Sequence, residues 1–138
     1  MYSEDDVYKV LYKLGLTKDE TKKAFEKNTY LSKVLNTDVI DVIRKFMKYG
    51  LTDKEIAEIA KQNPWMLTES FERMRYLEEY YKLVDITDYR ELLIKQPIAM
   101  SINPKDLKDL IQKLQTEGKS NDEIKEILLN IFTDYLSL

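Results

Sequence analysis

Residues 49–67 read YGLTDKEIAEIAKQNPWML, a stretch that contains a helix stop, a helix start and a second stop. Gly50 is placed to end one helix in the left-handed conformation, which glycine adopts at little steric cost. Thr52 and Glu55 have the spacing of a capping box that starts the next helix. The Asn-Pro dipeptide then ends that helix, because the residue before proline is pushed out of the helical region. The stretch therefore predicts a helix, a short turn and a second helix.

The same turn occurs four times along the chain. Gly15, Gly50 and Gly118 are each followed two residues later by threonine or serine, and five residues later by glutamate. Asp85 stands at the glycine position of a degenerate copy, so that 35, 35 and 33 residues separate successive turns. A repeat of about 34 residues is typical of stacked helical units. We therefore expect an all-α solenoid of about four helix-turn-helix repeats with eight main helices. The expected repeats of this single domain, 1–138, cover approximately residues 1–35, 36–67, 68–102 and 103–138.

Differences between the copies predict local structure. In the third copy Thr87 keeps the capping position, but Arg90 replaces the glutamate, so that a capping box cannot form. Trp65 follows the Asn-Pro stop, and the equivalent positions are apolar or aromatic. We expect Trp65 to be buried between repeats, and an exposed stacking ring is the alternative. Ser3 with Asp6 resembles a capping box at the start of the first helix.

Composition excludes several classes of function. The chain has 138 residues with no cysteine and no histidine, which removes disulfides, thiolate metal sites and the commonest general base. There is no phosphate-binding glycine loop and no nucleophile elbow. The carboxylate pairs Asp5–Asp6 and Asp85–Asp88 lie at expected helix-capping positions. We therefore expect no enzyme activity, and no catalytic residue, metal, cofactor or small-molecule substrate.

The sequence also predicts where the protein resides. Its apolar runs are only a few residues long, far short of the length that crosses a membrane. The N-terminal sequence MYSEDDVYKV is acidic and helical, unlike a basic and apolar signal peptide. We expect a cytoplasmic protein that does not engage membranes.

The repeat combines an apolar helix, Gly-Leu-Thr, two residues, Glu-Ile, a second helix, Asn-Pro and an apolar cluster. The second copy matches this pattern through Gly50, Leu51, Thr52, Glu55, Ile56, Pro64 and Leu67. The third copy keeps Ile86, Thr87, Pro97 and Met100. The pattern resembles the helical repeats of the mitochondrial transcription termination factor (mTERF) family. The resemblance implies a curved helical solenoid, related to transcription, whose concave side binds double-stranded nucleic acid without catalysis.

Basic side chains are unevenly distributed along the chain, whose net charge is -3. Residues 18–48 carry eight lysines and arginines against five acidic residues, whereas residues 78–138 carry eight against twelve. Clustered cations neutralise the phosphates of nucleic acids. We therefore expect the first two repeats to bind double-stranded DNA or RNA, and an ordinary solvated surface of mixed charge is the alternative. The candidate phosphate contacts are Lys22, Lys23, Lys27, Arg44, Lys45 and Lys48.

Ten tyrosines leave a second functional class open. Tyr8 and Tyr12 are one helical turn apart, as are Tyr76 and Tyr80. Tyrosines near lysine are able to stack on bases or to anchor a protein partner. The structural alternative is a boundary position, with the ring buried and the hydroxyl in water. The rival function is a protein-interaction module that uses tyrosine-rich or acidic surfaces of the later repeats and does not bind nucleic acid.

Overall fold

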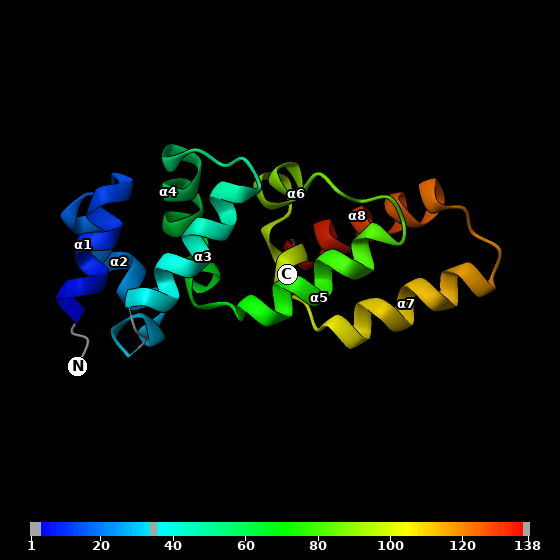
Figure 1. Cartoon of the computed structure of the whole chain (residues 1–138), viewed down its shortest axis with the longest axis horizontal. Coiled ribbons are helices and arrows are strands. Elements are labelled where there is room, and N and C mark those ends of the chain that lie inside the picture. The colour runs from blue at the N-terminus through cyan, green and yellow to red at the C-terminus, as the bar shows by residue number, and fades with distance from the viewer. Residues whose placement is uncertain (1–3, 34–35, 137–138) are drawn as a thin grey trace. The chain divides into compact units, whose positions relative to one another are not determined.

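The computed structural model describes residues 4–33 and 36–136, and this part of the chain is helical without a β-strand (Figure 1). Its α-helices are α1 (Glu4–Leu14), α2 (Lys18–Lys27), α3 (Asn36–Lys48), α4 (Asp53–Gln62), α5 (Phe71–Lys82), α6 (Tyr89–Lys95), α7 (Pro104–Thr116) and α8 (Asn121–Leu136). Short 3₁₀ helices follow α2, α4 and α6, namely η1 (Thr29–Ser32), η2 (Pro64–Thr68) and η3 (Pro97–Met100). The predicted all-α class, with eight main helices over the described ranges, is confirmed. The capping box predicted at Ser3 lies outside the described residues.

The helices fall into two compact units. Unit 1 covers Met1–Glu69 and contains α1 to α4, and unit 2 covers Ser70–Leu138 and contains α5 to α8. Each unit thus holds two of the helical pairs that the repeat predicts. The stacking of all four pairs into one solenoid stays a prediction.

The four turns between paired helices have the backbone conformation that the repeat predicts. The φ angle is 106° at Gly15, 100° at Gly50 and 83° at Gly118, and it is 63° at Asp85. In each turn the amide of the next residue donates to the carbonyl five positions earlier over 3.0–3.2 Å, as in a Schellman motif. Asp85 is therefore confirmed as the fourth copy of the glycine turn, since aspartate enters the left-handed region more readily than most residues.

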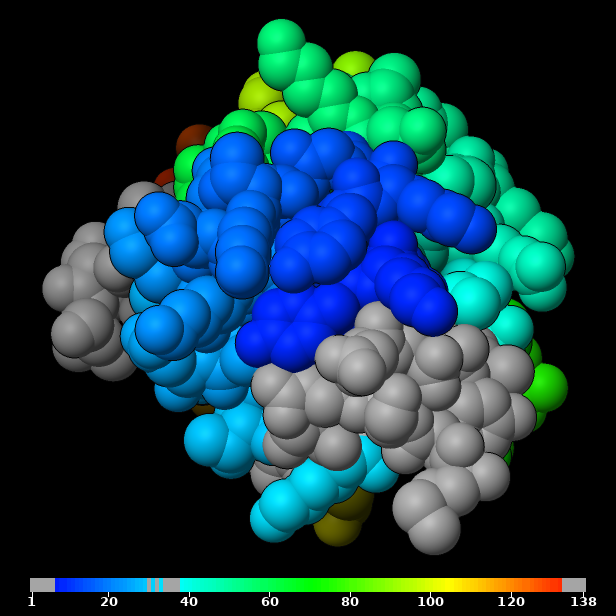
Figure 2. Space-filling view, turned by 90° about the vertical axis from the view of Figure 1, so that its left-hand side faces the viewer, coloured from blue at the N-terminus to red at the C-terminus, as the bar shows by residue number. Residues whose placement is uncertain are grey.

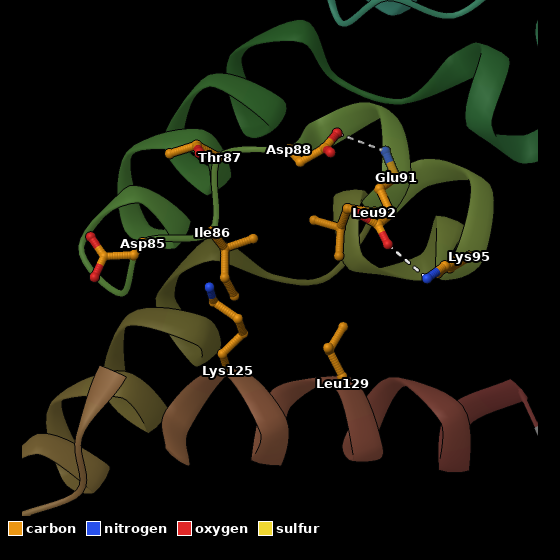
Figure 3. Close-up of a pocket in the computed structure, with 9 residues that line it drawn as sticks. All are labelled: Asp85, Ile86, Thr87, Asp88, Glu91, Leu92, Lys95, Lys125 and Leu129. Atoms are coloured by element: carbon orange, nitrogen blue, oxygen red, sulfur yellow. Dashed lines mark hydrogen bonds and ion pairs between the residues drawn. The ribbon is translucent and has the colours of Figure 1, made fainter. Parts of the chain in front are cut away.

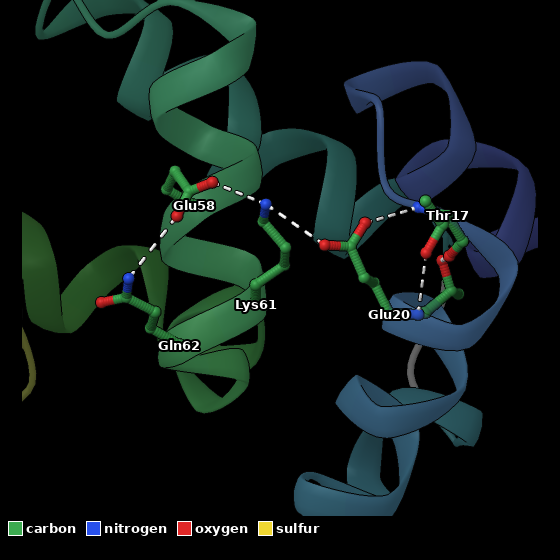
Figure 4. Close-up of polar contacts among 6 residues, drawn as sticks. Thr17, Glu20, Glu58, Lys61 and Gln62 are labelled. Carbon is green, nitrogen blue, oxygen red and sulfur yellow. Dashed lines mark hydrogen bonds and ion pairs between the residues drawn. The ribbon is translucent and has the colours of Figure 1, made fainter.

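Capping boxes start the second helix of three pairs. The amide of Glu20 donates to Thr17 Oγ1 over 3.1 Å, and the Glu20 carboxylate accepts from the Thr17 amide over 2.9 Å (Figure 4). The same reciprocal bonds occur at the Thr52 and Ser120 turns. The spacing of hydroxyl and glutamate residues predicts these three boxes, and they are confirmed.

The fourth cap differs from the prediction. Thr87 does not cap α6, because the helix begins one residue later than expected, at Tyr89, and Asp88 is its N-cap. The Asp88 carboxylate accepts from the amide of Glu91 over 3.1 Å. With Arg90 in place of glutamate no reciprocal bond can hold Thr87 at the cap, and an aspartate one residue later is an equally good acceptor.

Substitution of Gly118 tests the cost of the left-handed turn in isolation. A Cβ atom added there meets no heavy atom within 4 Å, so that backbone strain is the main penalty. We expect Gly118→Ala to lower the free energy of unfolding by about 1 kcal/mol. Chemical denaturation followed by circular dichroism measures the change.

Gly118→Asn is the matched control, because asparagine tolerates positive φ better than alanine does. It should cost clearly less than Gly118→Ala. Equal losses for the two variants would show that side-chain crowding or helix propensity, and not φ, sets the cost at this turn.

Unit 1 forms its core around α1 and α4, which contact each other and both of the other helices. Leu11 and Phe46 are fully buried within it. Asn28, which ends α2, is also buried, and its Nδ2 donates to the Pro64 carbonyl over 3.1 Å and to Thr68 Oγ1 over 3.0 Å. A buried amide needs such partners, so that these bonds tie the end of the first helical pair to η2.

Trp65 is not buried as predicted. Its side chain is 38% exposed, whereas Pro64, Met66 and Leu67 beside it in η2 are buried. A 3₁₀ helix has three residues per turn, which places Pro64 and Leu67 on the same inward side. Trp65 is directed away from that side. An apolar segment after the Asn-Pro stop therefore does not require that each of its residues is buried.

Unit 2 is built around Tyr81 of α5. The ring is fully buried and meets Phe132 of α8 edge to face, with ring centroids 6.2 Å apart and an interplanar angle of 78°. The hydroxyl donates to the Ala99 carbonyl in η3 over 2.6 Å. Tyr81 thus connects three elements of unit 2, and burial raises the pKa of its hydroxyl.

Candidate nucleic-acid interface

The structure places the six predicted phosphate contacts in unit 1, on two helices. Lys22, Lys23 and Lys27 are exposed on α2, whereas Arg44 and Lys48 are exposed on α3. Lys45 of α3 is half-buried, with its Nζ 5.8 Å from the centroid of the Tyr49 ring. On the face shown in Figure 2, α1 (dark blue) lies between α2 (lighter blue) and α3 (teal), and it packs against both. The two helices that carry the predicted contacts therefore lie on either side of α1.

A groove between α1 and α2 brings lysines and tyrosines together. Its lining residues are Tyr8, Lys9 and Tyr12 from α1 and Lys18 and Lys22 from α2, and its volume is about 430 Å³. We call it the Tyr–Lys groove. Tyr8 and Tyr12 share one face of α1 because they are four residues apart, and Lys18 and Lys22 share one face of α2 for the same reason.

The sequence prediction and the Tyr–Lys groove overlap only in Lys22. Lys9 precedes the basic segment, 18–48, so that the charge of this segment does not indicate it, and Lys18 lies in the segment but is not among the six predicted contacts. The i, i+4 spacings of the tyrosine pair and of the lysine pair were visible in the sequence. What was not visible is that these two faces meet, since this depends on how α1 packs against α2.

The two rings of the groove are held differently. Tyr8 is half-buried and stacks on the buried ring of Phe25, with centroids 4.4 Å apart and an interplanar angle of 11°. Tyr12 is 43% exposed, and its centroid lies 6.0 Å from that of Tyr8 with the planes tilted by 34°. Tyr8 matches the expected boundary position. Tyr12 instead presents its ring to solvent beside the lysines of the groove.

The carboxylate of Glu20, in the first turn of α2, is held by other partners. One oxygen accepts from the Thr17 amide, and the other lies 3.3 Å from Lys61 Nζ of α4 (Figure 4). The hydrogen bond with the Thr17 backbone lowers the Glu20 pKa, while the hydrogen bond with Glu58 raises the Lys61 pKa. Glu20 therefore joins α2 to α4, which positions the helix that carries Lys18 and Lys22.

A second groove, in unit 2, has a different character. Its lining residues are Asp85, Ile86, Thr87, Asp88, Glu91, Leu92, Lys95, Lys125 and Leu129, and its volume is about 290 Å³ (Figure 3). Glu91 is paired with Lys95 over 2.7 Å, and Asp85 accepts from Asn121 over 2.9 Å. Leu129 of α8 is 38% exposed at the groove. We call it the acidic–apolar groove.

The repeat relates the acidic–apolar groove to the corresponding place in unit 1. It lies between α6 and α8, which correspond in the repeat to α2 and α4 of unit 1. The positions of Glu20 and Lys61, which form an ion pair in unit 1, are occupied in unit 2 by Arg90 and Leu129. These residues cannot form that ion pair, and the α8 position instead contributes an apolar side chain to the groove.

Comparison of the chain with protein-family models, with curated proteins and with solved structures gives no match. Over the described ranges, no three carboxylates lie close enough together to hold a metal ion. The same part of the chain contains no helix that is long and apolar enough to cross a membrane.

Proposed function

We propose that the chain is a non-catalytic helical-repeat protein that binds nucleic acid through unit 1, with the Tyr–Lys groove as the contact site. The observation that carries the proposal is the gathering of Lys9, Lys18 and Lys22 around two tyrosine rings in one groove. Lysines neutralise phosphates and release counterions, while aromatic rings offer a stacking surface for bases. The resemblance to mTERF repeats supports the same class of function and an arrangement of the four pairs as one solenoid.

The other predicted contacts have a supporting role in this proposal. Lys23 and Lys27 are on the helix that forms one wall of the groove, and Arg44 and Lys48 are on α3, which lies on the other side of α1 from α2. Their positive field attracts a polyanion toward unit 1, even though the whole chain has a net charge of -3. Because the attraction is local and exposed, it is screened strongly by salt.

A titration against salt concentration tests the proposal. We expect a labelled oligonucleotide to bind at low salt with a Kd tighter than about 10⁻⁴ M, the usual limit for non-specific binders. Contacts from about three lysines should give a log–log salt slope of roughly -2 to -3, and hence a loss of about 20- to 60-fold between about 50 and 200 mM salt. Fluorescence anisotropy measures both quantities, and an absence of binding at low salt would rule the function out.

The acidic–apolar groove favours a second candidate function, a protein-interaction module. Three carboxylates and two lysines border an opening that includes Ile86, Leu92 and the exposed Leu129. Such a groove suits a partner segment that carries an apolar side chain next to a basic one. If the oligonucleotide titration shows no binding, protein interaction becomes the better-supported of the two candidate functions.

A further inference from the structure

We infer that the Tyr–Lys groove receives unpaired nucleotides, so that the chain prefers single-stranded nucleic acid to a duplex. The inference deepens the proposed function and rests on it. The resemblance to mTERF repeats implies a double-stranded ligand, whereas the side chains that line the groove fit a single strand.

The partly exposed ring of Tyr12 offers a stacking surface for a base. Tyr12 is 43% exposed, and its ring lies beside Tyr8, which is itself stacked on the buried Phe25. In a duplex the faces of the bases are covered by their neighbours, so that a surface ring reaches only backbone and groove edges. An unpaired base offers a free face, and every base has one, so that the contact tolerates any sequence.

The lysines border the rings from both walls. Lys9 belongs to α1, which carries the tyrosines, whereas Lys18 and Lys22 belong to the opposite wall on α2. A single strand that enters the groove places its phosphates beside these ammonium groups while a base turns toward Tyr12. This combination of a basic groove and aromatic platforms is the general mode of single-strand binding.

The size of the groove also favours a short segment of a single strand. A volume of about 430 Å³ is within the range of pockets that enclose a small molecule. The groove's lining of five side chains from two adjacent helices offers contact to a short segment of a flexible strand. The cations of α3 do not line this groove.

The test compares labelled oligothymidylate and oligouridylate, each about 12 nucleotides long, with a DNA duplex of the same length at one low salt concentration. Fluorescence anisotropy of the full chain should show tighter binding, by about fivefold or more, for at least one of the single strands. The two strands distinguish DNA from RNA as the preferred source. Equal or tighter binding of the duplex would overturn the inference while leaving the proposed function intact, and no binding of any probe would overturn both.

Tyr12 variants test the mechanism. Tyr12→Ala should weaken binding of the preferred single strand by about fivefold or more, whereas Tyr12→Phe, which keeps the ring, should bind like the parent. An abasic strand, which has phosphates but no bases, should bind weakly and equally to the parent and to Tyr12→Ala. If Tyr12→Ala weakens duplex, abasic and single-stranded probes alike, or weakens none of them, the stacking role is wrong.

Discussion

Simultaneous replacement of Lys18 and Lys22 by glutamate is expected to weaken nucleic-acid binding by at least about tenfold at low salt. Both lysines line the Tyr–Lys groove, and both are exposed. The change removes two phosphate contacts and places two carboxylates where phosphates would lie, so that attraction turns into repulsion. It should also make the log–log salt slope shallower by about 2.

A matched variant separates the groove from the general charge of unit 1. Lys23→Glu with Lys27→Glu changes the net charge by the same amount on the same helix, and these two lysines are exposed but do not line the groove. We expect this control to lose clearly less affinity than Lys18→Glu with Lys22→Glu. Equal losses would mean that the broad basic surface predicted from the sequence, and not the groove, makes the contact.

Tyr81→Ala is expected to have the largest effect on stability, a loss of about 3 to 5 kcal/mol in the free energy of unfolding. The substitution leaves a cavity where the buried ring met Phe132, and it removes the donor to the Ala99 carbonyl. Tyr76→Ala on the same helix is the control, since Tyr76 is 39% exposed, and its cost should stay within about 0.5 kcal/mol. Similar urea midpoints for the two variants would show that Tyr81 does not organise the core of unit 2.

The hydroxyl of Tyr81 makes a further contribution that depends on pH. Because burial raises the pKa of Tyr81, the folded state binds this proton more tightly than the unfolded state does. Its contribution is intact below the unfolded pKa of about 10 and is lost as pH rises above it, by about 1 kcal/mol at a pH of about 11.

Tyr81→Phe should remove this alkaline component, at a cost of about 1 to 3 kcal/mol at neutral pH for the Ala99 carbonyl left without its donor. Burial also raises the pKa of Tyr89, but Tyr89 is present in both proteins and its effect cancels in the comparison. Stability curves of equal alkaline slope in the parent and in Tyr81→Phe would contradict the assignment.

Much of the local structure could be predicted because it depends on residues close together in the sequence. A glycine turn and the capping box after it need only six consecutive residues. The segment from Gly15 to Glu20 contains one such turn and box, and it can be recognised without the rest of the chain. The prediction that Thr87 caps α6 was wrong because its neighbour Asp88 is also able to cap this helix, and does so. The Trp65 prediction was wrong because an apolar cluster shows that a segment is buried without showing which member faces outward.

The candidate contact site could be predicted only in part. Charge density along the chain led to unit 1 and to Lys22, but it did not lead to the partnership of Lys9 and Lys18 with two tyrosines. The acidic–apolar groove likewise needed the structure, although the loss of the Glu20–Lys61 pair at the equivalent positions of unit 2 is visible once the repeat is aligned.

The sequence by itself determined the all-α class, the four turns and three of the capping boxes, since backbone preference and hydrogen bonds within a few residues decide these features. Only the tertiary structure decided which helical faces meet. The pairing of the Tyr8–Tyr12 face with the Lys18–Lys22 face arises from side-chain packing between α1 and α2. Such packing depends on how well the surfaces of the two helices fit together, and this fit cannot be predicted from the sequence of either helix alone.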